Sequence, residues 1–119
     1  MLRISILAAA LVAVFAFVGS TGAMGTATLK GTTGPGFTIT LKKGTAKVKS
    51  VAHGKYTITV VDKSKAHNFR LKGPGLNKQI TTLAFKGTKT VTVTLKKGTY
   101  TYQCDPHVSL GMKGTFKVT

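Results

Sequence analysis

Three side chains that favour soft metal ions lie close together near the C-terminus of this 119-residue chain. Cys104, His107 and Met112 follow one another at the spacing C-x-x-H-x-x-x-x-M. A thiolate, an imidazole and a thioether suit copper, and a second imidazole would complete a trigonal set with a weak axial thioether. His67 is available for that position at the predicted end of a strand. The sequence therefore predicts a mononuclear copper site with these four ligands.

The N-terminus has the pattern of an export signal. A short positive segment, residues 1–3, is followed by an apolar run over residues 4–18 and by small residues at 19–23. This order is typical of a signal peptide, so we expect residues 1–23 to be removed and residues 24–119 to form the mature domain. The apolar run is shorter than the roughly 18 residues of a membrane-spanning helix, so an uncleaved anchor is the lesser alternative. The protein is expected to be periplasmic, cell-surface or secreted.

Cys104 is the only cysteine of the chain. Exported proteins usually pair their cysteines in disulfides, and an unpaired one is either reactive or bonded to another chain. Bonding to a metal would allow this thiolate to persist in an oxidising compartment. The alternative is a buried, inert cysteine that acts as a small hydrophobic residue. The neighbouring His107 and Met112 favour the metal.

The composition predicts one small β domain. The mature part is rich in Thr, Val, Gly and Lys and has almost no run of strong helix formers. Eight segments of alternating polarity recur along it, at residues 26–30, 37–41, 47–51, 55–61, 68–72, 90–95, 99–103 and 114–118. This spacing predicts an all-β fold, a Greek-key sandwich or barrel of about eight strands. Residues 75–82 have no clear alternation, and we expect a loop or one short helical turn there.

Three pieces of sequence around the predicted ligands form a set. They are His67-Asn68-Phe69 after Asp62-Lys-Ser64, then Gly98-Thr-Tyr-Thr-Tyr102 before the loop, and Cys104-x-Pro106-His107 with Met112-x-Gly114. In these pieces the chain resembles the small cupredoxins, the plastocyanin and amicyanin group of type 1 (blue) copper proteins. The resemblance implies a plastocyanin-like sandwich of eight strands that holds one copper ion near one end and carries single electrons between partners.

The resemblance also implies roles for four neighbouring residues. Asn68 is similar to the family residue that ties the histidine strand to the cysteine loop by hydrogen bonding, although an ordinary turn Asn is the alternative. Pro106 would stiffen the loop and remove a backbone N–H that could otherwise bond the sulfur. Leu110, with Pro106, would belong to an apolar patch where the loop histidine meets a partner. Lys113 would be among the lysines that steer the encounter.

Positive charge is the second distinctive feature of the sequence. The chain has 18 Lys and Arg against 2 acidic residues, and loss of Arg3 with the signal lowers the formal charge from +16 to +15. We expect an acidic redox protein as partner, or an anionic membrane or cell-wall surface, with association slowed by salt. Lysines that only keep strand edges soluble are the alternative. The predicted export and the lack of a recognised motif argue against nucleic-acid binding, and the chain is expected to be a monomer.

An enzyme is not expected. Multicopper oxidases resemble this loop but flank the cysteine with histidines, whereas the neighbours here are Gln103 and Asp105, and the chain has only 3 histidines. The predicted function is single-electron transport by one type 1 copper ion that cycles between Cu(II) and Cu(I). A second hypothesis is copper handling, in which the same ligands deliver the ion to a partner. A third is a metal-free β-sandwich that adheres to anionic surfaces.

Overall fold

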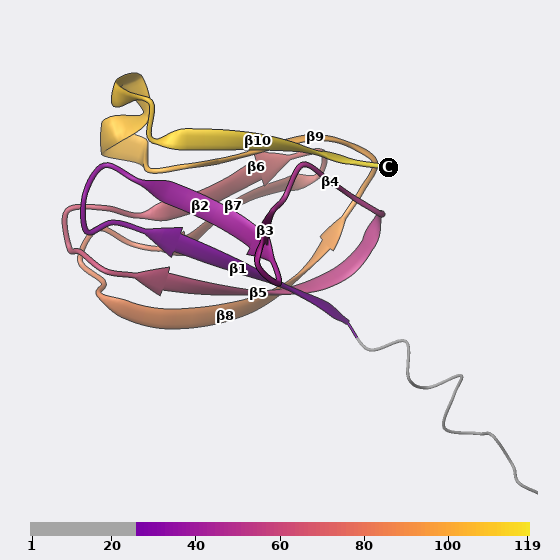
Figure 1. Ribbon diagram of the computed structural model, residues 1–119, viewed down its shortest axis with the longest axis horizontal. Coiled ribbons are helices and arrows are strands. Elements are labelled where there is room, and N and C mark those ends of the chain that lie inside the picture. Colours follow the sequence, from indigo (N-terminus) through magenta and orange to yellow (C-terminus); the bar gives the residue numbers. More distant parts are fainter. Residues whose placement is uncertain (1–25) are drawn as a thin grey trace, which may run out of the picture.

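Ten strands form two facing sheets in the computed structural model, which describes residues 26–119 (Figure 1). The predicted signal peptide, residues 1–23, lies outside the described residues. Sheet A has the order β3 (Ala46–Lys47), β2 (Ile39–Lys43), β1 (Ala27–Thr33), β5 (Gly54–Asp62) and β8 (Gly87–Leu95). Sheet B has the order β4 (Ser50–Val51), β10 (Lys113–Val118), β9 (Gly98–Gln103), β6 (Phe69–Gly73) and β7 (Leu76–Thr81). One 3-10 helix, η1 (Asp105–Leu110), connects β9 to β10.

The strands form because their apolar residues alternate with polar ones. In β5, Tyr56, Ile58 and Val60 are buried while their neighbours are partly exposed. Successive side chains of a strand point to opposite faces, so this pattern places one face of the strand between the two sheets. β9 follows the same rule, with Tyr100 and Tyr102 pointing inward. The predicted all-β sandwich is therefore confirmed.

Aromatic packing in the core supports the end of β9, where the ligand loop begins. The ring of Tyr102 stacks on Phe69 at a centroid distance of 5.9 Å, and Tyr100 stacks on Phe116 at 5.5 Å. All four side chains are buried, and burial of each large apolar side chain contributes about 1.5–3 kcal/mol. The Tyr100 hydroxyl also donates a 2.9 Å hydrogen bond to the backbone oxygen of Pro74. These contacts tie β9 to β6 and β10, the strands on either side of it.

The strand count and one segment differ from the prediction. The structure has ten strands instead of about eight, because the predicted strand at residues 47–51 is divided into β3 and β4, which pair in different sheets, and because β7 was not expected. The expectation of a loop or helical turn at residues 75–82 is wrong, since β7 lies there and pairs with β6. β7 is an edge strand whose register with β6 shifts between Phe69 and Arg70, so Ile80 and Thr81 are both buried. This irregularity removes the alternation that identifies a strand.

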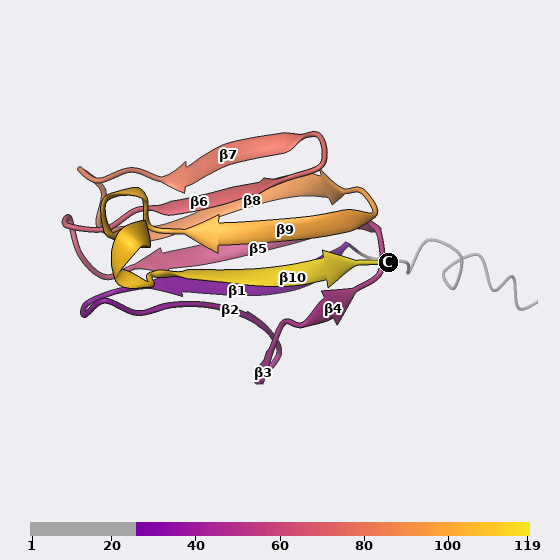
Figure 2. The same ribbon diagram turned by 90° about the horizontal axis from the view of Figure 1, so that it is seen from above.

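Four connections gather at one end of the sandwich, which we call the loop end. They are residues 34–38, 63–68, 82–86 and 104–112, at the left of Figure 1. Figure 2 shows η1 at the same end, with the C-terminus at the opposite one. Two of these connections begin in sheet A and end in sheet A or B, and two begin in sheet B, so both sheets contribute to the loop end. Within residues 26–119 the structure has no helix of the length and apolar character needed to span a bilayer.

Candidate metal centre

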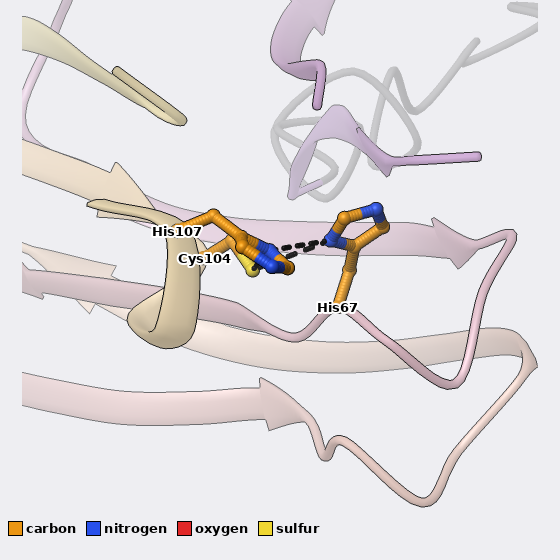
Figure 3. A group of neighbouring side chains, drawn as sticks. All are labelled: His67, Cys104 and His107. Carbon is orange, nitrogen blue, oxygen red and sulfur yellow. Dashed lines mark hydrogen bonds between the residues drawn. The ribbon is translucent and has the colours of Figure 1, made fainter. Parts of the chain in front are cut away.

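Three of the four predicted ligands converge at the loop end (Figure 3). The Nδ1 atoms of His67 and His107 lie 3.0 Å apart. The Cys104 sulfur lies 3.6 Å from Nδ1 of His67 and 3.4 Å from Nδ1 of His107. His67 precedes β6, Cys104 follows β9, and His107 belongs to η1. The imidazole of His67, distant in sequence, thus forms a small triangle of donor atoms with the thiol and the second imidazole of the cysteine loop.

The size and chemistry of this triangle fit one transition-metal ion. Metal–nitrogen and metal–sulfur bonds are roughly 2.0–2.3 Å long, so one ion can reach three atoms whose separations are 3.0–3.6 Å. Both histidines present the same ring nitrogen, Nδ1, towards the sulfur. A His2Cys set of this kind is typical of type 1 copper sites. The described residues contain no other group of three or more His, Cys, Asp or Glu side chains close enough to hold a metal.

The Cys104 thiol is completely buried. Burial raises its pKa above the ordinary value, and the nearby carboxylates of Asp105 and Asp62 add to this effect. The backbone N–H groups of Asn68 and His107 act in the opposite direction, because they donate towards the sulfur and favour the thiolate. The pocket therefore already holds donors for a thiolate, but a cation is needed to make the deprotonated form favourable at neutral pH.

The β1–β2 connection orients His67. Nε2 of His67 lies 3.2 Å from the backbone oxygen of Pro35, to which it can donate a hydrogen bond. Such a bond leaves Nδ1 unprotonated and directed at the other donors, which is the usual arrangement of a metal-binding histidine. The ring of Phe37 meets both histidine rings edge-on, at centroid distances of 5.8 Å for His67 and 4.8 Å for His107.

The sequence did not indicate that residues 34–38 belong to the site. The signal available was an aromatic residue directly after a Gly-Pro-Gly turn, since loops often carry functional residues. In the structure Phe37 is 62% exposed, so it covers the histidines without belonging to the core. Gly34 has a φ of +74° and lies so close that an added Cβ would be 2.8 Å from Cδ2 of His67.

Asn68, for which the resemblance implies a connecting role, is hydrogen-bonded to the cysteine loop. Its side-chain oxygen accepts a 2.7 Å hydrogen bond from the backbone N–H of Asp105, and its amide nitrogen donates to the Asp105 carboxylate at 2.8 Å. The same amide nitrogen donates to Gln79 on β7 at 2.9 Å. Asn68 is fully buried, so these bonds satisfy a polar group that would otherwise be costly.

The Asp105 carboxylate is the centre of a wider polar network that sequence reasoning missed. Arg70 on β6 donates to one of its oxygens at 2.9 Å, and Gln103 on β9 donates to the other at 2.9 Å. Burial opposes ionisation of this carboxyl, but the hydrogen bonds from Gln103, Arg70 and Asn68 outweigh it and lower its pKa. Asp105 adjoins Cys104, so the network fixes the loop beside the sulfur.

Backbone hydrogen bonds close the ligand loop. The N–H of Cys104 donates to the oxygen of Met112 at 3.0 Å, and the N–H of Met112 donates to the oxygen of His107 at 3.3 Å. Met112 is 1% exposed, so its side chain lies inside the protein near the start of β10. Its place as axial ligand stays a prediction. Pro106 stands in the first turn of η1, where its missing N–H costs no hydrogen bond.

The two predicted docking residues lie on the surface of the loop end. Leu110, the last residue of η1, is 66% exposed, and Lys113 at the start of β10 is exposed. His107 is partly exposed, whereas His67 is buried. The loop histidine is therefore the ligand that reaches towards solvent.

Comparisons with known proteins agree with this geometry. The family model described as copper binding proteins, plastocyanin/azurin family, matches residues 38–119. Rusticyanin from Thiobacillus ferrooxidans has a TM-score of 0.56 at 20% identity, over 77% of this chain and 76% of that chain. Reduced auracyanin from Roseiflexus castenholzii has a TM-score of 0.53 at 21% identity, over 79% of this chain and 98% of that chain. No curated protein matches the chain.

The two structural neighbours show a shared fold, and the family model matches more than half of the sequence. The match includes all four predicted ligands, and three of them meet in space. The chain therefore belongs to the plastocyanin/azurin family of copper-binding proteins.

Proposed function

We propose that this protein is an exported, mononuclear blue copper protein that carries single electrons between redox partners. The observation that supports this most directly is the triangle of His67 Nδ1, His107 Nδ1 and Cys104 Sγ at the loop end. His67, Cys104 and His107, with Met112 as a further weak donor, would hold a copper ion there, and the ion would supply the Cu(II)/Cu(I) couple. Export rests on the sequence pattern of residues 1–23.

The surroundings of the ligands favour electron transfer because they limit movement. The hydrogen bond of His67 to Pro35 and those of Asn68 to Asp105 hold the two sides of the site in one arrangement. Ligands that are fixed by the fold before an ion binds do not need to reorganise when the ion changes its charge. A small reorganisation permits fast exchange of one electron.

The proposed route for the electron passes through His107. Its ring is partly exposed and lies against Phe37, and Leu110 follows it on η1. We call Phe37, Pro106, Leu110 and His107 the contact patch. An apolar patch around a ligand permits close approach of a partner, and the surrounding lysines, Lys113 among them, would attract an acidic redox protein over a longer range.

No enzymatic activity is part of the proposal. Oxidases of related sequence need a cluster of three further copper ions, which many histidines must hold. The described residues contain one group of possible metal ligands and one histidine outside it, His53. His53 lies against the backbone oxygen of Thr119 at 2.9 Å, away from the other two histidines. This leaves electron transfer as the function that the site supports best.

The test is spectroscopic. Purified protein loaded with Cu(II), after reduction of Cys104, should show an intense visible thiolate-to-copper band and a small copper hyperfine splitting. Cys104→Ser should abolish the band, because the oxygen ligand gives no such transition. A colourless wild-type protein that binds no copper would contradict the proposal and favour the metal-free alternative.

Kinetics separate electron transport from copper delivery. An electron carrier should be reduced and reoxidised rapidly and reversibly, while the ion exchanges slowly with a chelator in either oxidation state. A delivery protein should lose Cu(I) readily to a chelator or to an acceptor protein. Rapid loss of the ion on every reduction would contradict the electron-carrier hypothesis and support the copper-delivery hypothesis.

A further inference from the structure

A row of hydrogen-bond donors crosses the outer face of sheet A, far in sequence from the metal ligands. Lys47 on β3 stands directly opposite Lys42 on β2, and Lys42 stands opposite Lys30 on β1. The row continues with Thr59 on β5 and Thr90 on β8. The hydroxyl oxygens of these two threonines are 3.2 Å apart, so their side chains lie side by side. We call these five residues the donor row.

The donor row lies on the solvent side of the sheet. Lys30 follows the buried Leu29, and Lys42 follows the buried Leu41, so both lysines point away from the core. Lys30, Lys42 and Lys47 are all exposed. Neighbouring strands are about 4.8 Å apart, so the three lysines extend side by side from adjacent backbone positions on one face of the sheet.

Like charges directly opposite one another destabilise a sheet. An acidic neighbour could offset this cost, but neither of the two acidic residues of the chain is available. The Asp62 side chain is 1% exposed, and the Asp105 carboxylate is bound by Arg70 and two amides at the loop end. The three lysines therefore have no counter-charge from the protein.

Protection of sheet edges does not explain the row. Charged residues on edge strands hinder aggregation, and the edges of sheet A are β3 and β8. Lys42 and Lys30 belong to β2 and β1, which have a neighbouring strand on both sides. Lys47 lies on the edge strand β3, but the repulsion between Lys42 and Lys30 is inside the sheet, where no edge needs protection.

We propose that the donor row binds a linear polymer that carries phosphate groups along its chain. Ammonium and hydroxyl groups are donors that suit phosphate oxygens. One donor on each successive strand matches an extended chain with regularly repeated anions. The large hydrophobic side chains that are exposed among residues 26–119 are Phe37, Leu83 and Leu110, none of which belongs to sheet A. A hydrated polymer fits such a face better than a bilayer, in which apolar anchors would insert.

The experiment compares two variants of equal charge. The row variant carries Lys30→Thr, Lys42→Thr and Lys47→Thr. The control variant carries Lys78→Thr, Lys89→Thr and Lys117→Thr, three exposed strand lysines that face no other lysine across a strand pair. Binding of long-chain inorganic polyphosphate is measured by titration calorimetry at fixed salt, with orthophosphate at the same phosphate concentration as a second probe.

The row variant should bind polyphosphate about tenfold more weakly than wild type, since three exposed ion pairs are lost together. The control variant should lose clearly less, and orthophosphate should bind poorly to all three proteins. Without polymer the row variant should have the higher melting temperature, because the repulsion is relieved. The melting comparison shows that the row variant is folded.

Three results would overturn the proposal. Equal losses in the two variants would mean that only the total charge attracts polyphosphate. If orthophosphate bound as strongly as polyphosphate, compared per phosphate group, binding would not require an extended chain along the donor row. Row-dependent binding to vesicles of anionic phospholipid, without binding to polyphosphate, would assign the face to a membrane. None of these outcomes depends on copper, so the proposed electron transfer is tested separately.

Discussion

His67 and His107 direct the same ring nitrogen, Nδ1, towards the Cys104 sulfur but occupy very different surroundings. His67 is 3% exposed and is held by the backbone of Pro35, while His107 is partly exposed on a short helix. The first histidine therefore belongs to the framework of the site, and the second is the one that a partner can approach. Met112 differs from both, since its backbone closes the loop whatever its side chain does.

At the residue scale, replacement of Met112 by Leu should separate the effect of this residue on the reduction potential from its effect on copper binding. A leucine of similar volume keeps the buried packing at a cost below about 1.5 kcal/mol. With Met112 in its predicted place as weak axial donor, the change removes a ligand that stabilises Cu(II) more than Cu(I), so the protein should keep copper and colour while its reduction potential rises. The check is voltammetry together with the visible spectrum.

His67→Ala is the comparison for that prediction. It removes an equatorial ligand from the buried side of the site, and copper affinity should fall much further than in Met112→Leu. If both variants lost copper equally, Met112 would not be a weak axial ligand. The melting temperature of the metal-free proteins shows whether either loss reflects unfolding.

At the scale of elements, the connection between β1 and β2 forms one wall of the site. Gly34 has a positive φ, and an added Cβ there would lie 2.8 Å from the His67 ring, whereas an added Cβ on Gly36 would meet no atom within 4 Å. The two glycines are two residues apart in the same turn, so they provide a matched pair for mutation.

Gly34→Ala should displace His67 and weaken the copper site. The added methyl would lie 2.8 Å from Cδ2 of His67, and the backbone conformation disfavours any residue with a Cβ. We expect a loss of about 1–3 kcal/mol in stability and a shifted copper spectrum. Gly36→Ala should change neither. Unchanged copper spectra in both variants would show that this turn does not position His67.

The Asp105 network links the ligand loop to β6 and β9, and it should make stability depend on pH. The folded state lowers the pKa of this carboxyl below its ordinary value of 3.8. A lowered pKa means that the ionised group stabilises the fold above the unfolded pKa, and that this contribution disappears as the pH falls through the folded pKa. The metal-free protein should therefore lose stability on acidification below about pH 4.

Asp105→Asn should reduce this acid sensitivity. At neutral pH the variant should be less stable by about 1–3 kcal/mol, because Arg70 loses its charged partner. On acidification its melting temperature should fall less than that of the wild type. Lys72→Gln, a change on the same strand as Arg70, should leave the fall of the melting temperature on acidification unchanged. If the melting temperatures of Asp105→Asn and wild type fell in parallel as the pH was lowered, Asp105 would be excluded as the titrating group.

At the scale of the whole molecule, positive charge and apolar contact occupy different parts of the surface. The three exposed large hydrophobic side chains among residues 26–119 belong to connections of the loop end, while lysines are spread over both sheets. Under the proposed function, charge brings an acidic partner close, and the contact patch then couples the two redox centres.

These two contributions should separate in stopped-flow kinetics with an acidic electron-transfer partner. Rising ionic strength should slow association steeply, and Lys113→Glu should weaken this salt dependence. Leu110→Asp should impair transfer even at high salt, because it places a charge in the contact. Both side chains are exposed, so stability should hardly change. Transfer that is insensitive to salt and to Leu110→Asp would exclude docking at this end.

The sequence by itself determined the parts of this protein that depend on residue type and short spacing. The alternation of apolar residues in β5 and β9 predicts strands, because a strand has a two-residue period. The spacing from Cys104 to Met112 indicates a copper loop, because few other kinds of site combine a thiol, an imidazole and a thioether. The role of Asn68 was predicted in another way, from the resemblance of this segment to the small cupredoxins.

Only the tertiary structure decided which distant segments complete the site. Pro35 contributes a backbone oxygen, which any residue possesses, so no side-chain pattern could point to it. Arg70 and Asp105 are far apart in the sequence, and their pairing depends on the register of β6 with β9. β7 escaped recognition because an edge strand with shifted pairing loses its alternation. The opposed lysines likewise follow from strand register, which local sequence leaves open until the sheets pack.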